Sequence, residues 1–140
     1  MIGVILISHG EMAKGMKDAL GMFFGSQLEA VEVVSLTPEK SSDTFYEELQ
    51  EARERVDRNN GVVIFADLFG GTPFNQASRI MDDSCCVIAG MNLSMLMEFF
   101  VIRDNAKSLA EIPFEEILNA GREGIRYTKE VQMNQDNEEL

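Results

Sequence analysis

The charge and length of this chain exclude several classes of function before any motif is considered. It has 140 residues, and its 24 acidic against 12 basic side chains give a net charge of −12. Such a surface repels the phosphates of nucleic acids, so we expect no nucleic-acid partner. No apolar run reaches the roughly 18 residues of a membrane helix, and the N-terminus lacks the basic stretch of a secretory signal. We therefore expect a cytoplasmic protein with one domain.

The first half of the chain alternates apolar strands with helices. Residues 2–7 are apolar throughout, which is typical of a strand buried on both faces, and residues 11–24 have helical spacing of apolar side chains. A second strand is expected over 30–36, near the sheet edge because Glu32 interrupts its apolar pattern. Serine and aspartate caps then predict a charged helix over 41–58 that buries one apolar stripe.

The middle of the chain repeats this alternation. Residues 61–66 form an apolar run rich in β-branched side chains, which predicts a third strand. Thr72 and Pro73 predict the start of a helix, with threonine as the N-cap and proline at the first helical position. This helix is expected to end near Met81, and a fourth apolar strand follows over 85–89.

The last third of the chain predicts helices and one late strand. Residues 93–102 predict a methionine-rich apolar helix of the kind found in cores and subunit contacts. Two short helical stretches are expected at 106–110 and 114–120, and a half-polar fifth strand at 125–133. Residues 134–140 are polar and acidic and are expected to form a frayed tail.

Together these elements predict an α/β fold of the flavodoxin-like, doubly wound kind. Its mainly parallel sheet should have the strand order 2-1-3-4, with helices on both faces. Residues 1–133 then form a single domain, followed by the acidic tail. The adjacent Cys85 and Cys86 point to opposite faces of the fourth strand, and their spacing does not suit zinc. We expect buried free thiols there and no metal site.

Two strand ends in this sheet carry polar residues that suit one site. His9, the only histidine, follows the first strand, and Asp67 follows the third. In the order 2-1-3-4 these strands are neighbours about 4.8 Å apart, so the two side chains can reach hydrogen-bonding distance. A carboxylate that holds one imidazole nitrogen leaves the other bare and nucleophilic. Backbone N–H groups of Gly70, Gly71 and Thr72, at a helix N-terminus, could receive a phosphoryl group.

This combination predicts a histidine that becomes phosphorylated. Other chemistries lack their motifs in this sequence. There is no Gly-x-Ser-x-Gly elbow of a serine hydrolase and no Gly-x-x-x-x-Gly-Lys-Ser/Thr phosphate loop.

Four ordered blocks of sequence give the chain a resemblance to a known family. They are Ser8-His9-Gly10, the segment Asp67-Leu68-Phe69-Gly70-Gly71-Thr72-Pro73-Phe74-Asn75, the segment Ile88-Ala89-Gly90-Met91-Asn92-Leu93, and Gly121-Arg122-Glu123-Gly124. With these blocks the chain resembles, over nearly its whole length, the IIA domains of the mannose class of the bacterial sugar phosphotransferase system.

The resemblance implies a function as a phosphoryl carrier. By it, His9 would accept a phosphoryl group from the carrier HPr and pass it to a separate IIB protein during sugar uptake. Asp67 would orient the histidine, while Gly70, Gly71 and Thr72 would hold the phosphate. No cofactor would be needed, and the membrane would be reached only through the transporter complex.

The resemblance also implies a homodimer and leaves alternatives open. In the family fold a last, antiparallel strand is exchanged between subunits, and residues 125–133 match it here. Ser94 stands where many members have proline, and Phe69 where some have tryptophan, but neither change removes a reacting group. The phosphoryl-donor subunits of dihydroxyacetone kinase share this fold and histidine. A phosphorylation-dependent regulatory binding protein and a flavodoxin-type small-molecule binder are further alternatives.

Overall fold

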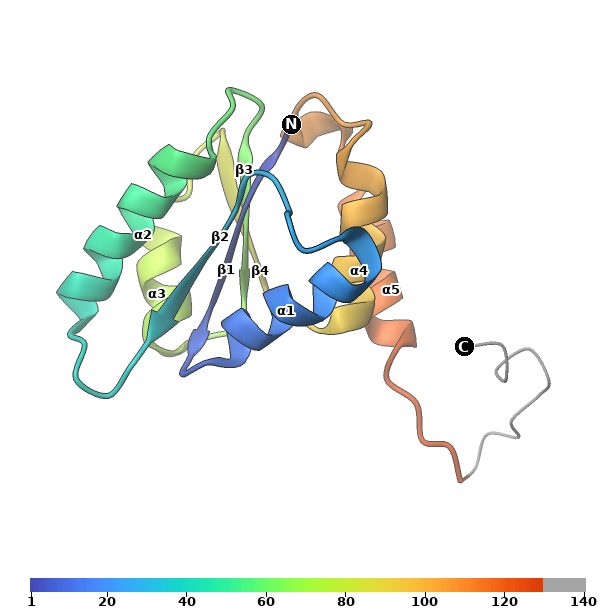
Figure 1. Cartoon of the computed structure of the whole chain (residues 1–140), viewed down its shortest axis with the longest axis horizontal. Coiled ribbons are helices and arrows are strands. Elements are labelled where there is room, and N and C mark those ends of the chain that lie inside the picture. The colour runs from blue at the N-terminus through green and yellow to red at the C-terminus, as the bar shows by residue number, and fades with distance from the viewer. Residues whose placement is uncertain (130–140) are drawn as a thin grey trace.

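The computed structural model describes residues 1–129 and has the predicted three-layer architecture (Figure 1). Its sheet consists of four parallel strands in the order β2-β1-β3-β4, as predicted. The strands are β1 (Gly3–His9), β2 (Val31–Leu36), β3 (Val62–Ala66) and β4 (Cys85–Ala89). The helices are α1 (Met12–Phe24), α2 (Ser42–Val56), α3 (Gly71–Arg79), α4 (Leu93–Arg103) and α5 (Phe114–Glu123), with a short 3-10 helix at Leu109–Glu111.

The helices cover the two faces of the sheet unequally. Figure 1 shows α2 and α3 on one face and α1, α4 and α5 on the other. Side chains of β1 alternate between the two cores: Val4 and Leu6 pack towards α1, α4 and α5, whereas Ile5 and Ile7 pack towards α2 and α3. All four are fully buried. A strand buried on both faces explains why residues 2–7 have no polar alternation.

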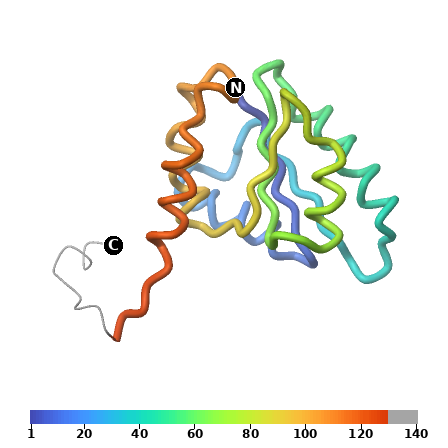
Figure 2. The backbone as a smooth tube through the Cα atoms, turned by 180° about the vertical axis from the view of Figure 1, so that it is seen from behind, coloured from blue at the N-terminus to red at the C-terminus, as the bar shows by residue number. Residues whose placement is uncertain are grey.

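The two strands at the edges of the sheet are less completely buried. Glu32 of β2 is half-buried and accepts hydrogen bonds from the guanidinium of Arg55 in α2, at 3.0 and 3.1 Å. The position of β2 at the edge confirms the interpretation of this charged residue. Figure 2 shows the opposite edge, where β4 runs between α3 and α5 with no further strand beside it in the described chain.

Close packing of α5 on α4 depends on a glycine inside α5. A Cβ on Gly121 would lie 3.0 Å from Cε of Met95 and 3.4 Å from Oδ1 of Asn92. The side chain of Asn92 caps α4 by accepting from the N–H of Met95 at 2.9 Å, and its amide donates to the carbonyl of Gly121 at 3.0 Å. One asparagine therefore both starts α4 and ties α5 to it.

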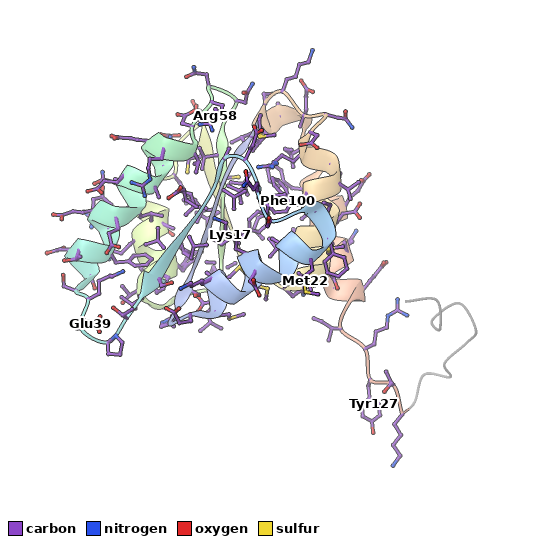
Figure 3. All side chains as sticks on the ribbon, in the orientation of Figure 1. Lys17, Met22, Glu39, Arg58, Phe100 and Tyr127 are labelled. Atoms are coloured by element: carbon purple, nitrogen blue, oxygen red, sulfur yellow. The ribbon has the colours of Figure 1, made fainter. Side chains whose placement is uncertain are left out.

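Not all apolar side chains of these helices are covered. In Figure 3, Phe100 of α4 lies among the packed helices, whereas Met22 at the end of α1 stands out from the surface. Their exposed fractions are 4% and 86%. No helix within residues 1–129 has the length and apolar character needed to cross a membrane.

Three predictions about local structure were wrong at their boundaries. Thr72 is not the N-cap of α3: Gly70 is, with a φ of +96° that favours glycine, so the helix begins at Gly71. Pro73 is then the third helical residue, which the first turn tolerates because no N–H is needed there. The helix also ends at Arg79, two residues before the predicted end.

The segment after α4 also differs from its prediction. Instead of a helix over 106–110, only the 3-10 helix Leu109–Glu111 forms. Pro113 lies close behind, so there is too little chain for an α-helix. Residues 125–129 form no strand in this single chain. The remainder of the predicted strand, and the tail 134–140, lie outside the described residues.

Candidate functional site

The register of the two central strands brings the two predicted site residues together. Ile7 of β1 pairs with Ala66 of β3, and the N–H of Asp67 donates to the carbonyl of Ile7 at 3.2 Å. His9 and Asp67 therefore leave neighbouring strands at the same carboxyl edge of the sheet. This is the juxtaposition that the strand order predicted.

His9 and Asp67 make two hydrogen bonds to each other through one carboxylate oxygen. Oδ2 of Asp67 lies 2.8 Å from Nδ1 of His9 and accepts from the backbone N–H of His9 at 2.9 Å. The other oxygen, Oδ1, accepts from the N–H of Leu68 at 2.9 Å. The Asp67 side chain is 7% exposed, whereas that of His9 is 46% exposed. The acid is thus fixed and shielded, and the imidazole stays open to a partner.

The environment of Asp67 decides which nitrogen of His9 carries the proton. Burial raises the pKa of Asp67, but hydrogen bonds from His9 and Leu68 and the charge of His9 lower it, and the net result lies below its ordinary value. An ionised carboxylate can only accept hydrogen bonds. Nδ1 therefore carries the hydrogen, and Nε2 of the neutral ring has a free lone pair.

The start of α3 lies against this free nitrogen. A Cβ on Gly71 would lie 3.1 Å from Cε1 and 3.3 Å from Nε2 of His9, at a φ of +82° that itself favours glycine. The N-cap, Gly70, provides no side-chain bond to the helix. The N–H groups of Gly70, Gly71 and Thr72 have no acceptor within the helix, and Pro73 has no N–H at all. This helix end can bind an anion beside Nε2.

One polar residue next to His9 was not predicted as part of the site. Ser8, interpreted from sequence only as part of the strand end, is fully buried, and its hydroxyl bonds to the turn that carries His9. The only sign of this role in the sequence is that a polar residue stands directly before the only histidine.

Cys85 is buried and Cys86 half-buried, both as free thiols, and burial raises the pKa of each to about 11. This agrees with the expected free thiols and makes them poor nucleophiles at neutral pH.

The sequence matches a known protein family over most of its length. It matches the family model described as PTS system fructose IIA component over residues 3–117, where PTS denotes the phosphotransferase system. The chain belongs to this family. This match confirms the resemblance drawn from the four sequence blocks: the chain is a IIA protein of the phosphotransferase-system family.

Relatives of this IIA protein include both longer and comparable chains. It is 33% identical over 130 residues to the mannose-specific EIIAB component of Escherichia coli K12, covering 91% of this chain and 40% of that protein. The chain thus spans about two fifths of the EIIAB component's length. It is 31% identical over 107 residues to the fructose-specific EIIA component of Bacillus subtilis, covering 75% of this chain and 73% of that one.

A solved structure shares the fold of this IIA protein. The phosphotransferase system component EIIA from Streptococcus agalactiae superposes with a TM-score of 0.80 at 28% identity. The superposition covers 91% of this chain and 97% of that chain. The agreement extends beyond the sheet to nearly the whole chain.

The Asp67 carboxylate should make stability depend on pH in the acid range. At neutral pH we expect Asp67→Asn to lower the free energy of unfolding by about 1–3 kcal/mol, because a charged acceptor becomes a neutral one. The folded-state pKa of Asp67 lies below its ordinary value of 3.8. Its stabilisation is therefore fully present above that value and is lost as the pH falls through the folded pKa.

Urea unfolding of the wild type and of Asp67→Asn, repeated across the acid range, measures this dependence. The difference in stability between the two proteins should shrink as the pH falls below about 4. A difference that persisted unchanged to about pH 3 would show that the charge of Asp67 does not stabilise the fold.

Proposed function

We propose that this IIA protein is a phosphoryl carrier in which Nε2 of His9 accepts the phosphoryl group. The donor is the phosphohistidine of HPr, and the acceptor is an EIIB component that serves sugar uptake and phosphorylation in the cytoplasm. One observation carries the proposal: the bare Nε2 lies against the N-terminus of α3 while Asp67 holds Nδ1. The phosphohistidine donor already carries an activated group, so the transfer needs no nucleotide.

The transfer exchanges one phosphorus–nitrogen bond for another. The lone pair of Nε2 of His9 attacks phosphorus, the bond from phosphorus to the donor histidine breaks, and its electron pair returns to the donor imidazole. The ring of His9 gains positive charge as the new bond forms, and the Asp67 carboxylate on Nδ1 stabilises that charge. The N–H groups of Gly70, Gly71 and Thr72 donate to the phosphoryl oxygens. Transfer to EIIB repeats the step with His9 as the leaving group.

Exposed apolar side chains near the site favour a protein as the partner. Leu68 and Phe69, which follow Asp67, are 58% and 84% exposed, and Met12 at the start of α1 is 44% exposed. The Phe69 ring rests on Phe74, with ring centroids 4.9 Å apart. Exposed aromatic and aliphatic side chains are typical contact residues of protein interfaces. The net charge of −12 favours approach by a basic partner.

The intact mass of the protein after incubation with phosphoenolpyruvate, enzyme I and HPr tests the proposal. We expect a gain of one phosphoryl group that mild acid removes and that His9→Ala abolishes, because His9 is the only histidine. Addition of an EIIB component should then discharge the group. A normal gain in His9→Ala would overturn the assignment, and a gain without discharge would favour a regulatory binding protein.

The glycine at the start of α3 offers a sharper test of the phosphate position. Gly70 and Gly71 both have positive φ, so alanine at either position strains the backbone by about 1–3 kcal/mol. Only at Gly71 would the new Cβ meet the His9 ring, since nothing lies within 4 Å of a Cβ at Gly70. We expect Gly71→Ala to slow phosphorylation about tenfold or more beyond its matched control, Gly70→Ala.

Stopped-flow or quenched mass measurements on both folded variants give the two rates. Equal rates in Gly70→Ala and Gly71→Ala would mean that the ring and the helix end do not need their close contact.

We also propose that the protein is a homodimer in which residues 125–133 of each copy pair with β4 of the other. The outer edge of β4 has no strand beside it within the described chain, which leaves backbone groups without ladder partners. Next to this edge lies an apolar groove of about 430 Å³. It is lined by Phe69, Cys86, Val87, Ile88, Ala89, Phe114 and Leu118. An added strand would fill both the edge and the groove.

Two truncations separate this dimer from other modes of association. A chain that ends at Gly124 should be a monomer by sedimentation velocity, because it lacks the proposed strand. A chain that ends at Met133 should remain a dimer, since it loses only the acidic tail. A dimer in both truncations would contradict strand exchange and would place the contact elsewhere.

A further inference from the structure

Ser8, the residue before His9, is a polar side chain fully shielded from solvent. The side chain of Ser8 is 0% exposed, and the residue lies near the end of β1, between Ile7 and His9. Its hydroxyl donates to the carbonyl of Gly10 at 3.1 Å and accepts from the N–H of Ala13 at 2.8 Å. Both hydrogen-bonding capacities of one buried hydroxyl therefore go to the chain segment that follows the histidine.

The hydroxyl of Ser8 replaces the usual cap of α1. Glu11, the N-cap residue, makes no side-chain bond to the helix, and the N–H of Ala13 in the first turn is bonded by Ser8 instead. The N–H of Gly10 donates to the carbonyl of Leu36 at 2.7 Å, and its φ is +59°. The tight turn between β1 and α1 is thus tied to β1 by Ser8 and to β2 by Leu36.

His9 lies at the start of this fixed turn. Its interaction with Asp67 requires that its backbone N–H and its ring Nδ1 are both correctly positioned. Its backbone N–H and its ring Nδ1 reach the same oxygen, at 2.9 and 2.8 Å. A small shift of the backbone would lengthen one bond or the other. The fixed turn keeps the ring aimed so that Nε2 meets the start of α3 at Gly71.

We propose that Ser8 is a positioning residue for phosphoryl transfer, which fixes the turn so that Asp67 selects the Nδ1–H tautomer of His9. The inference rests on the proposed role of His9 as phosphoryl acceptor. Removal of the hydroxyl leaves the Ala13 N–H and the Gly10 carbonyl without their buried partner. The turn then shifts so that these two groups can form hydrogen bonds with water, and the His9 ring loses its fixed tautomer and orientation.

Three substitutions of Ser8 and one control test this role. Ser8→Ala removes the hydroxyl, Ser8→Cys keeps the shape with a weak hydrogen-bonding group, and Ser8→Thr keeps the hydroxyl. Ser78→Ala is the control, because the Ser78 hydroxyl also donates to a backbone carbonyl, that of Phe74 at 3.0 Å, but within α3. The measurements are the rate of phosphorylation by phospho-HPr and the ring ¹⁵N shifts of His9, whose signals are unique in this chain.

We expect Ser8→Ala and Ser8→Cys to slow phosphorylation about tenfold or more and to move the ¹⁵N shifts towards a mixture of tautomers. Ser8→Thr should keep the phosphorylation rate and the ¹⁵N shifts close to those of the wild type, and Ser78→Ala should leave both unchanged. If Ser8→Ala does not fold, Ser8→Cys decides the question. Loss of rate with wild-type ¹⁵N shifts, or wild-type values of both in a folded variant, would overturn the proposal.

The two readouts keep this inference separate from the function on which it rests. A wild-type protein that takes no phosphoryl group from HPr would remove the proposed function. The ¹⁵N shifts would still show whether Ser8 sets the tautomer, because they need no phosphorylation.

Discussion

One oxygen atom of Asp67 holds the candidate site together. Because Oδ2 accepts from both the backbone and the ring of His9, the end of β1 and the orientation of the imidazole are fixed by the same atom. Asp67 directly follows the last residue of β3, so its position relative to His9 depends on the register of β1 against β3. A slip of one residue would turn the carboxylate towards the other face of the sheet. The chemistry of the site is therefore a consequence of strand register.

The cores on both faces of the sheet make that register unambiguous. Val4 and Leu6 belong to one core, and Ile5 and Ile7 to the other, so any shift would exchange their neighbours on both faces. The buried strand β1 has no polar side chain before Ser8, which lies near its carboxyl end. Apolar packing thus defines the point at which polar chemistry can begin, and the helices that start there complete the site.

Continuous apolar runs are a strong signal, which is why the four strands could be predicted. Their order, and with it the pairing of His9 with Asp67, followed from the flavodoxin-like fold that the alternation of strands and helices indicated. The start of α3 could not be predicted, because the local preference of Thr72 for the N-cap was overridden by the two glycines that turn against the His9 ring. The predicted helix over 106–110 also failed, because Pro113 leaves room only for the 3-10 helix Leu109–Glu111 before it. The partners of the Ser8 hydroxyl depend on the turn itself, which spacing alone does not describe.

The donors at the start of α3 suit the proposed role of a carrier better than that of a tight phosphate binder. A carrier must accept a phosphoryl group and then release it, so its bound state must be neither too weak nor too stable. A lysine or arginine on the phosphoryl oxygens would bind them as an ion pair and oppose their departure. Backbone N–H groups of Gly70, Gly71 and Thr72 carry only partial charge, and the helix adds about half a unit. In the proposed transfer, the full negative charge of Asp67 acts on the ring of His9 and would stabilise it as it gains the phosphoryl group.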